Sequence, residues 1–354
     1  MSASGFSLTG GVSQKEVMFF TAQLAIMLET GTNLTTSLQS ICDQCANPRM
    51  KSTIEGVLSD VVGGKTLSSA LGRHSKVFGN VFVAMVRAGE LGGFLTEMLN
   101  RLHEFQKLKQ DMRSKITTAL AYPVVLALMS VGVVVFMVTY VLPKMTTVFE
   151  GKEEILPTIT KVVLAISKGF VAWWPLILVG VIGGIVGFVA WIRTRSGRTL
   201  FDKAKITLPV IGPLSRLLYS ARLLRTMGVM LESGIPLLDG VEVTRGAVGN
   251  TQYAMFLDHV RNSVSEGKTL SEPFSGSTLF APTIKQMVTT AESTGTTGMV
   301  MLRMADYYEE EMTVKLKGLT ALLEPAIVVI MGAVVGVIAL ALFLPLFKLS
   351  SAVG

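Results

Sequence analysis

The chain has 354 residues, of which 50% are hydrophobic and only 16% are charged, and its formal net charge is +7 at pH 7. This composition excludes an ordinary soluble enzyme and indicates a membrane protein. Only 2 cysteines and 3 histidines are present, which excludes a disulfide framework and leaves little for a metal cage.

The N-terminal part of the chain predicts a short lead followed by helices. Residues 1–14 have no basic start followed by an apolar core, so we expect a flexible lead rather than a cleaved signal. Apolar residues at helical spacing in EVMFFTAQLAIMLE end near Gly31, which predicts a helix that stops at a glycine with positive φ. Further helices, about six with no convincing strand, form a predicted domain over residues 15–123.

Three long uncharged stretches predict transmembrane helices: residues 124–142, 170–192 and 326–344. Each has about the twenty residues that a helix needs to cross a bilayer. Pro123 and Pro325 stand directly before the first and third stretch, and we interpret them as helix starts, where no N–H is needed. The stretches contain no Asp, Glu, Lys, Arg or His, which argues against a transporter.

Basic residues near the stretches predict their orientation. Five Lys or Arg lie within residues 101–115, and eight lie within 193–225 against a single Asp. The positive-inside rule therefore places the N-terminus and a second domain, 193–325, in the cytoplasm. The connection 143–169 and the tail 345–354 are then periplasmic.

The second cytoplasmic domain repeats the first. The pentapeptide GKTLS occurs at 64–68 and again at 267–271, a shift of 203 positions that also aligns Glu29 with Glu232 and Gly31 with Gly234. Beyond about residue 78 the shift is 202, and it aligns Glu90 with Glu292, Gly93 with Gly295, and Pro123 with Pro325. The repeated unit is a cytoplasmic domain with the span that follows it, and its second copy starts near residue 217.

The lysine in GKTLS suggests a nucleotide-binding P-loop, but the context excludes one. Ser59 and Asn262 stand where the motif requires another glycine, and both copies follow a helix rather than a strand. We interpret the pentapeptide as a break between helices, in which glycine ends one helix and Thr66 caps the next. No cofactor is expected.

Four glutamates recur beside the glycine turns: Glu29, Glu90, Glu232 and Glu292. A catalytic pair needs a cleft and a nucleophile or metal, which the sequence does not reveal. We interpret these side chains as acceptors for N–H groups at helix starts, with a docking face as the alternative.

Two further motifs have a plain and a functional interpretation. Cys42 and Cys45 form C-x-x-C, but no second such motif exists, and we favour two structural thiols over a redox or zinc site. The acidic run Glu309, Glu310 and Glu311 is either a solvated helix face or a docking surface for a partner.

Several motifs carry a resemblance to a known family over roughly residues 15–350: LESGIPLLDGVEVTRGAVGN, GELGG, AESTG, VLPKM and the tripeptides AYP and LEP. With these motifs the chain resembles the GspF/PilC family, the inner-membrane platform proteins of type II secretion systems and type IV pili. The resemblance implies an all-α integral membrane protein of the bacterial inner membrane. Two repeated cytoplasmic six-helix bundles and three transmembrane helices are implied, with the N-terminus cytoplasmic and the C-terminus periplasmic.

The resemblance also implies a function without catalysis. A platform of this family is expected to couple a hexameric assembly ATPase to the extrusion of pilin or pseudopilin subunits. Other inner-membrane assembly proteins, the lipid bilayer and further copies of the chain are expected partners, and nucleic acid is not. A repeat-built transporter is the rival, and the choice between pilus and secretion machine stays open.

Overall fold

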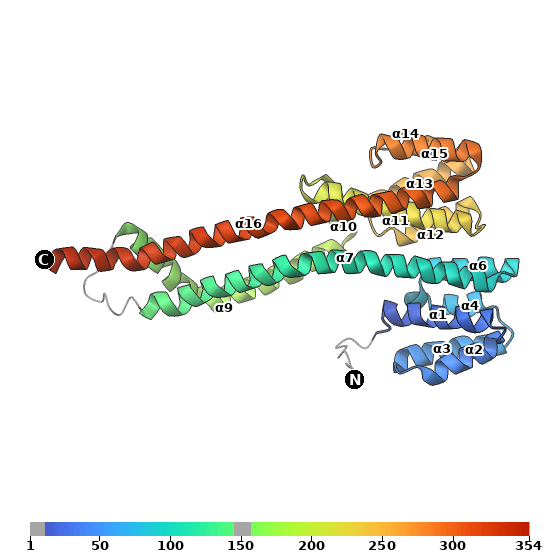
Figure 1. Cartoon of the computed structure of the whole chain (residues 1–354), viewed down its shortest axis with the longest axis horizontal. Helices are drawn as coiled ribbons and strands as arrows, with labels where there is room; N and C mark the ends of the chain where they lie inside the picture. Colours follow the sequence, from blue (N-terminus) through green and yellow to red (C-terminus); the bar gives the residue numbers. More distant parts are fainter. Residues whose placement is uncertain (1–10, 145–156, 354) are drawn as a thin grey trace. The chain divides into compact units, whose positions relative to one another are not determined.

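The computed structural model describes residues 11–144 and 157–353, which are helical without a strand (Figure 1). The chain divides into two compact units. One comprises Met1–Arg113 with Asp202–Met312, and the other comprises Ser114–Phe201 with Thr313–Gly354. The predicted lead 1–14 and connection 143–169 lie partly outside the described residues.

The first four helices of the first domain begin at polar capping residues. Ser13 and Glu16 form a capping box, in which the Glu16 N–H donates to Ser13 Oγ (3.2 Å) and the Ser13 N–H donates to Glu16 Oε2 (2.6 Å). Thr66 Oγ1 accepts the Ser69 N–H, which confirms the predicted cap. The helices are α1 (Gln14–Glu29), α2 (Leu34–Gln44), α3 (Pro48–Val62), α4 (Leu67–Arg73), α5 (Ser75–Phe78), α6 (Asn80–Gly92) and α7 (Leu95–Phe136).

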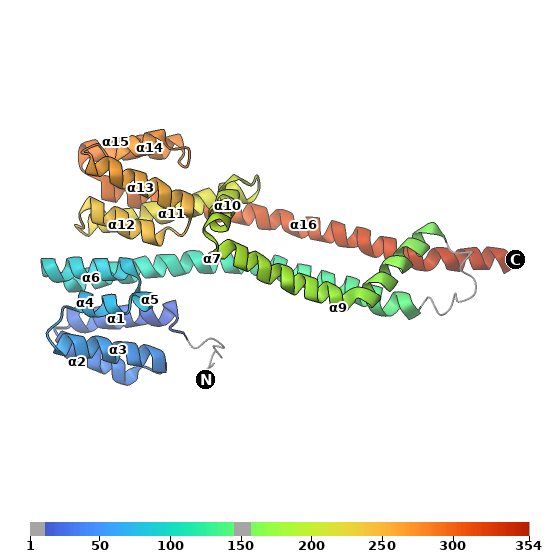
Figure 2. The same ribbon diagram turned by 180° about the vertical axis from the view of Figure 1, so that it is seen from behind.

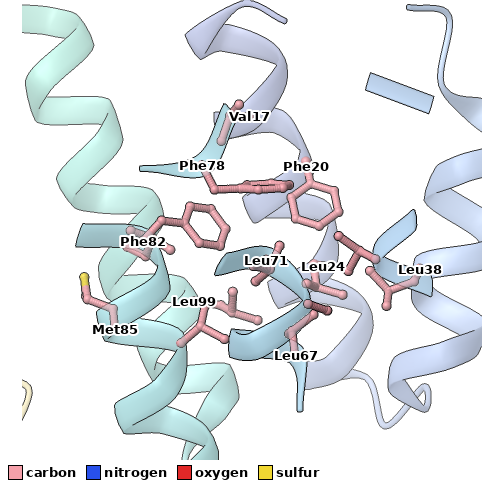
Figure 3. Packing of buried hydrophobic residues seen from close by; sticks show 14 of the residues in the cluster. Val17, Phe20, Leu24, Leu38, Leu67, Leu71, Phe78, Phe82, Met85 and Leu99 are labelled. Atoms are coloured by element: carbon pink, nitrogen blue, oxygen red, sulfur yellow. The ribbon is translucent and has the colours of Figure 1, made fainter. Parts of the chain in front are cut away.

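The core of the first domain is built from aromatic and leucine side chains that these helices turn inward (Figure 3). Phe78 lies between Phe20 and Phe82, with ring centroids 5.5 and 5.0 Å away. Leu24 and Leu71 are completely buried. Each such side chain contributes roughly 1.5–3 kcal/mol by leaving water, so this core rather than any metal or disulfide stabilises the domain.

The second domain repeats this arrangement with one element missing. Its helices are α11 (Ile211–Glu232), α12 (Leu237–Ala247), α13 (Thr251–Ser265), α14 (Ser271–Gly276), α15 (Pro282–Thr294) and the start of α16 (Thr297–Val353). No counterpart of α5 lies between α14 and α15, which is where the repeat shift drops from 203 to 202. Its core is more aromatic: Phe274 and Phe280 each pack within 5 Å of Phe256.

The helices that hold the first and third predicted spans begin in the two domains, well before those spans. α7 runs through Pro123 and α16 runs through Pro325, so the interpretation of these prolines as helix starts is wrong. A proline inside a helix removes one hydrogen bond, but a break at the edge of a bilayer would leave several backbone groups without partners. The helix therefore continues from the domain into the apolar stretch.

The remaining predicted span lies in α9 (Thr158–Arg193), which is followed by α10 (Arg195–Thr207; Figure 2). The described residues contain three helices long and apolar enough to cross a membrane, within 95–144, 158–176 and 297–344. Leu178–Arg193 and α10 make a further apolar pair bent by 98°. The all-α membrane fold predicted from the sequence is confirmed.

Buried hydroxyl groups join the helices within the membrane unit. The Thr160 hydroxyl of α9 donates to the Ala341 carbonyl (2.8 Å), and the Ser167 hydroxyl donates to the Val138 carbonyl (2.5 Å). Val138 belongs to η1 (Met137–Val141), a π-helical turn that continues α7. Such turns expose a backbone carbonyl to a neighbouring helix, so these bonds hold α9 against α16 and η1.

Candidate functional site

The first GKTLS copy is closed by Glu90, which lies at the end of α6. The Glu90 carboxylate accepts the backbone N–H of Leu67 (2.5 Å) through Oε1 and the N–H of Ser68 (2.9 Å) through Oε2. These are the first N–H groups of α4, which have no partner inside the helix. The half-buried carboxylate therefore caps α4 and ties it to α6.

The second copy has the same geometry. The Glu292 carboxylate, from α15, accepts the N–H of Leu270 (2.6 Å) through Oε1 and the N–H of Ser271 (2.8 Å) through Oε2. Thr269 does not cap its helix as Thr66 does, because α14 begins one residue later, at Ser271; its hydroxyl contacts Ser271 Oγ as that of Thr66 contacts Ser68 Oγ. In both copies, one glutamate carboxylate thus accepts two backbone N–H groups at the turn. We call this arrangement the glutamate clamp.

The clamps occupy the backbone N–H groups that a phosphate-binding turn would need. A P-loop binds phosphate through successive backbone N–H groups at a helix start. Here the N–H groups of Leu67, Ser68, Leu270 and Ser271 already bind a carboxylate of the same chain. GKTLS is an anion-binding turn whose anion is the protein's own glutamate.

The predicted glycine turns end helices at equivalent places in the two domains. Gly31 (φ 84°) and Gly234 (φ 71°) follow the ends of α1 and α11, and the prediction of positive φ there is confirmed. The next N–H groups, of Thr32 and Ile235, donate to the carbonyls of Met27 and Met230 at 3.0 Å. Gly93 and Gly295 adopt the same left-handed conformation after α6 and α15.

The other two predicted glutamates do not form clamps. Glu29 and Glu232 are exposed at the ends of α1 and α11. The Glu232 carbonyl accepts from Arg101 Nη1 (2.8 Å), which joins the second domain to α7 of the first. Glu232 Oε1 lies only 2.7 Å from where a Cβ on Gly298 would sit, so this glycine lets α16 approach the end of α11.

The residues before the two prolines meet each other. Tyr122 and Glu324 occupy equivalent positions of the repeats, directly before Pro123 and Pro325. The Tyr122 hydroxyl donates to Glu324 Oε1 at 3.1 Å, which joins α7 to α16. The signal for this contact was present in the tripeptides AYP and LEP, but the sequence does not say that equivalent positions touch.

The acidic run does not form one face, because Glu309 is held by an arginine that the sequence analysis missed. Arg225 of α11 is buried and donates through Nε to Glu309 Oε1 (3.1 Å) and through Nη2 to Asp306 Oδ1 (2.6 Å). Glu310 is exposed and Glu311 is half-buried. Of the three predicted docking residues, Glu310 is the one that the structure leaves exposed.

The two cysteines are free thiols at the end of α2. Burial raises the pKa of the Cys42 thiol, and the nearby Glu55 charge acts in the same direction. Reactive cysteines need the opposite shift. No group of three or more His, Cys, Asp or Glu side chains in the described residues is placed to hold a metal ion.

The arrangement defines a class of protein: a membrane protein built from two clamped helical domains, each continuous with an apolar helix. A sequence model of the family described as "Type II secretion system (T2SS), protein F" matches residues 20–143 and 223–345, once for each repeat. The chain therefore belongs to this family, and the resemblance recognised from its motifs is confirmed.

Relatives of the chain come from two machines. The type IV pilus assembly protein PilC of Myxococcus xanthus is 32% identical over 344 residues, which are 97% of this chain and 82% of that protein. PilC of Thermus thermophilus is also 32% identical, over 97% of this chain and 84% of its own length. The type II secretion system protein F of Vibrio cholerae is 31% identical over 99% of this chain and 86% of that protein.

Proposed function

We propose that this chain is an inner-membrane platform that couples a cytoplasmic assembly ATPase to the extrusion of pilin or pseudopilin subunits. The observation that carries the proposal is the family match over both repeats, together with similarity to pilus and secretion proteins along nearly the whole chain. Relatives from the two machines are almost equally similar, so both remain candidates.

The long helices support a mechanical role. α7 has 42 residues and α16 has 57, which correspond to lengths of about 63 and 86 Å at 1.5 Å per residue. Each runs without interruption from a clamped domain into an apolar stretch. A displacement applied to the domain is therefore passed along a continuous helix rather than through a loop.

The chain contains no evident source of energy of its own. Its two candidate phosphate turns are occupied by Glu90 and Glu292. The energy in this proposal comes from a partner ATPase that docks on the cytoplasmic domains. Further copies of the chain and other inner-membrane assembly proteins complete the machine.

A transporter is the weaker alternative. Coupled transport needs ionisable groups at mid-membrane. The predicted spans 124–142, 170–192 and 326–344 contain none, and Glu324 stands outside them.

The test is deletion of the chain in its host, followed by binding measurements with the host's own assembly ATPase. We expect loss of pili or of a secreted protein, restored by the wild-type chain. The purified chain should hydrolyse no ATP but should bind the ATPase and change its turnover. Glu310→Lys should weaken that contact, while Glu272→Lys, an equally exposed charge reversal on α14, is the matched control. Normal assembly after deletion, or ATP hydrolysis by the chain alone, would contradict the proposal.

A further inference from the structure

α10 leaves the end of α9 at a right angle. The axes of Leu178–Arg193 and Arg195–Thr207 differ by 98°. Thr194 makes the bend: its Oγ1 donates to the Trp191 carbonyl (2.6 Å) and accepts the Gly197 N–H (3.1 Å). A Cβ at Gly197 would lie 2.1 Å from the Trp191 carbonyl oxygen, so only glycine permits the bend. Because spans run close to the bilayer normal, a helix perpendicular to the end of one lies along the membrane surface.

One side of α10 packs against the second domain. Asp202 and Ile206 are 3% and 5% exposed. The Asp202 carboxylate accepts the Thr251 N–H (3.0 Å) through Oδ2, and the Asp202 carbonyl accepts from Asn250 Nδ2 (3.2 Å). Both donors stand at the start of α13. This side of the helix is therefore already occupied.

The opposite side of α10 carries an apolar stripe. With successive residues about 100° apart, Leu200, Ala204 and Leu208 fall one above another, facing away from Asp202 and Ile206. The Leu208 N–H donates to the Ala204 carbonyl (3.0 Å), so the helical path continues to that residue. Leu200 is 58% exposed and Leu208 is 49% exposed. We call these three residues the α10 stripe.

Basic side chains flank the stripe on both sides. Helical spacing places Lys203 along one edge and Arg198 along the other. Both are exposed, and neither has a salt bridge to any residue that the structure describes. Long basic side chains beside an apolar surface extend their charges toward lipid phosphates while their stems cover the apolar groups.

We propose that α10 is an interfacial helix that binds the anionic phospholipid surface of the leaflet it borders. The α10 stripe enters the boundary between headgroups and acyl chains, and Arg198 and Lys203 bind the headgroup phosphates. Lipid is the occupant because α10 is continuous with an apolar helix, lies perpendicular to it and has cations along both edges. The proposal concerns where the chain meets the bilayer and stands apart from its role as a platform.

The experiment measures the depth of the α10 stripe in lipid with the full-length chain. In a background with Cys42→Ser and Cys45→Ser, a single Leu208→Cys is labelled with an environment-sensitive fluorophore and reconstituted in nanodiscs. Lipids with a spin label near the headgroup quench a fluorophore at that depth. In phosphatidylglycerol-rich discs we expect quenching at Leu208→Cys, and also at Val210→Cys, a second exposed site just beyond the stripe. Met255→Cys on α13, which is 59% exposed, should show none.

Charge removal tests the headgroup contact. Arg198→Gln with Lys203→Gln should lower the ratio of docked to undocked helix about 30-fold in anionic discs, by the usual contribution of two basic residues. For the wild-type chain, replacing the anionic discs by phosphatidylcholine discs should lower this ratio to a similar extent. The matched control, Arg49→Gln with Arg87→Gln, removes two exposed charges from the first domain and should leave the ratio of docked to undocked helix unchanged. Absence of quenching at both Leu208→Cys and Val210→Cys, equal quenching at Met255→Cys, or quenching that does not depend on lipid charge would overturn the proposal. None of these results bears on pilus assembly or secretion.

Discussion

Replacing Glu90 by Gln measures what a glutamate clamp contributes to the first domain. The carboxylate accepts the N–H groups of Leu67 (2.5 Å) and Ser68 (2.9 Å). A glutamine offers one acceptor oxygen and one NH₂ group, so one backbone N–H loses its acceptor and faces a donor. A hydrogen bond to a charged group contributes about 1.5–3 kcal/mol, and Glu90 is only half-buried, so we expect a loss of about 2 kcal/mol.

Cys42 provides the assay. Its side chain is 2% exposed and belongs to the core of the first domain, so a thiol reagent reaches it only when that domain opens. With Cys45→Ser as background, and under conditions where closing is faster than labelling, 2 kcal/mol corresponds to labelling about 30-fold faster. Glu292→Gln is the matched control because it removes the same clamp from the other domain, and it should change Cys42 labelling little.

A further variant shows what result refutes the reasoning. Leu71→Ala removes a completely buried side chain from α4, and such a change costs about 3 kcal/mol. It should therefore accelerate Cys42 labelling more than Glu90→Gln does. If Leu71→Ala accelerates labelling and Glu90→Gln does not, the carboxylate does not stabilise the helix start.

Two other predictions concern the start and the end of α1. Gly31→Val should cost about 1–2 kcal/mol, because a β-branched residue resists φ 84°, and Gly31→Asn should cost less; equal Cys42 labelling rates for the two variants would contradict this. Burial opposes ionisation of Glu16, but hydrogen bonds from the Ser13 N–H and the Asn47 side chain hold its pKa below the ordinary 4.5. Its contribution to stability is therefore present above pH 4.5 and is lost as the pH falls through the lowered value. Hydrogen exchange of the first turn of α1, corrected for intrinsic rates, should show this loss in the wild type and not in Glu16→Gln.

The repeat and the apolar stretches could be predicted because they are local patterns in the sequence. Gly31 and Thr66 were placed correctly, since a helix end and a cap depend on the residues beside them. Pro123 and Pro325 were misinterpreted for the same reason. Their local preference is for a helix start, but the continuous helix around them satisfies more backbone groups than a break would.

The partners of the glutamates depend on contacts that span many residues. Glu90 reaches Leu67 over 23 positions, and Glu292 reaches Leu270 over 22. The sequence indicated that the glutamates accept N–H groups at helix starts, but not at which helix starts. It also predicted this role for Glu29 and Glu232, which do not have it. The right angle before α10 was not predicted, because the requirement for glycine at position 197 comes from its contact with the Trp191 carbonyl, which the sequence does not show.

The two repeats differ most where α16 is fixed to its domain. Arg225, buried in α11, pairs with Asp306 and Glu309 of α16, whereas the equivalent positions of the first repeat hold Ala22, Glu104 and Lys107. The second domain thus holds its long helix by an ion pair that the first domain lacks.

Arg225→Gln should therefore loosen α16 specifically. Breaking a buried ion pair costs about 3 kcal/mol, because the carboxylates lose the Arg225 charge that balances them; Glu309 is 20% exposed and Asp306 is 54% exposed, so the cost falls mainly on Glu309. Hydrogen exchange at residues 300–312 should then become about 100-fold faster, with residues 95–107 of α7 as the internal control. Adding Glu309→Gln should restore part of the protection, since it removes a negative charge that the Arg225 guanidinium balances in the wild type. If the double variant exchanges as fast as Arg225→Gln alone, charge pairing is not what holds α16, and its attachment rests on apolar packing.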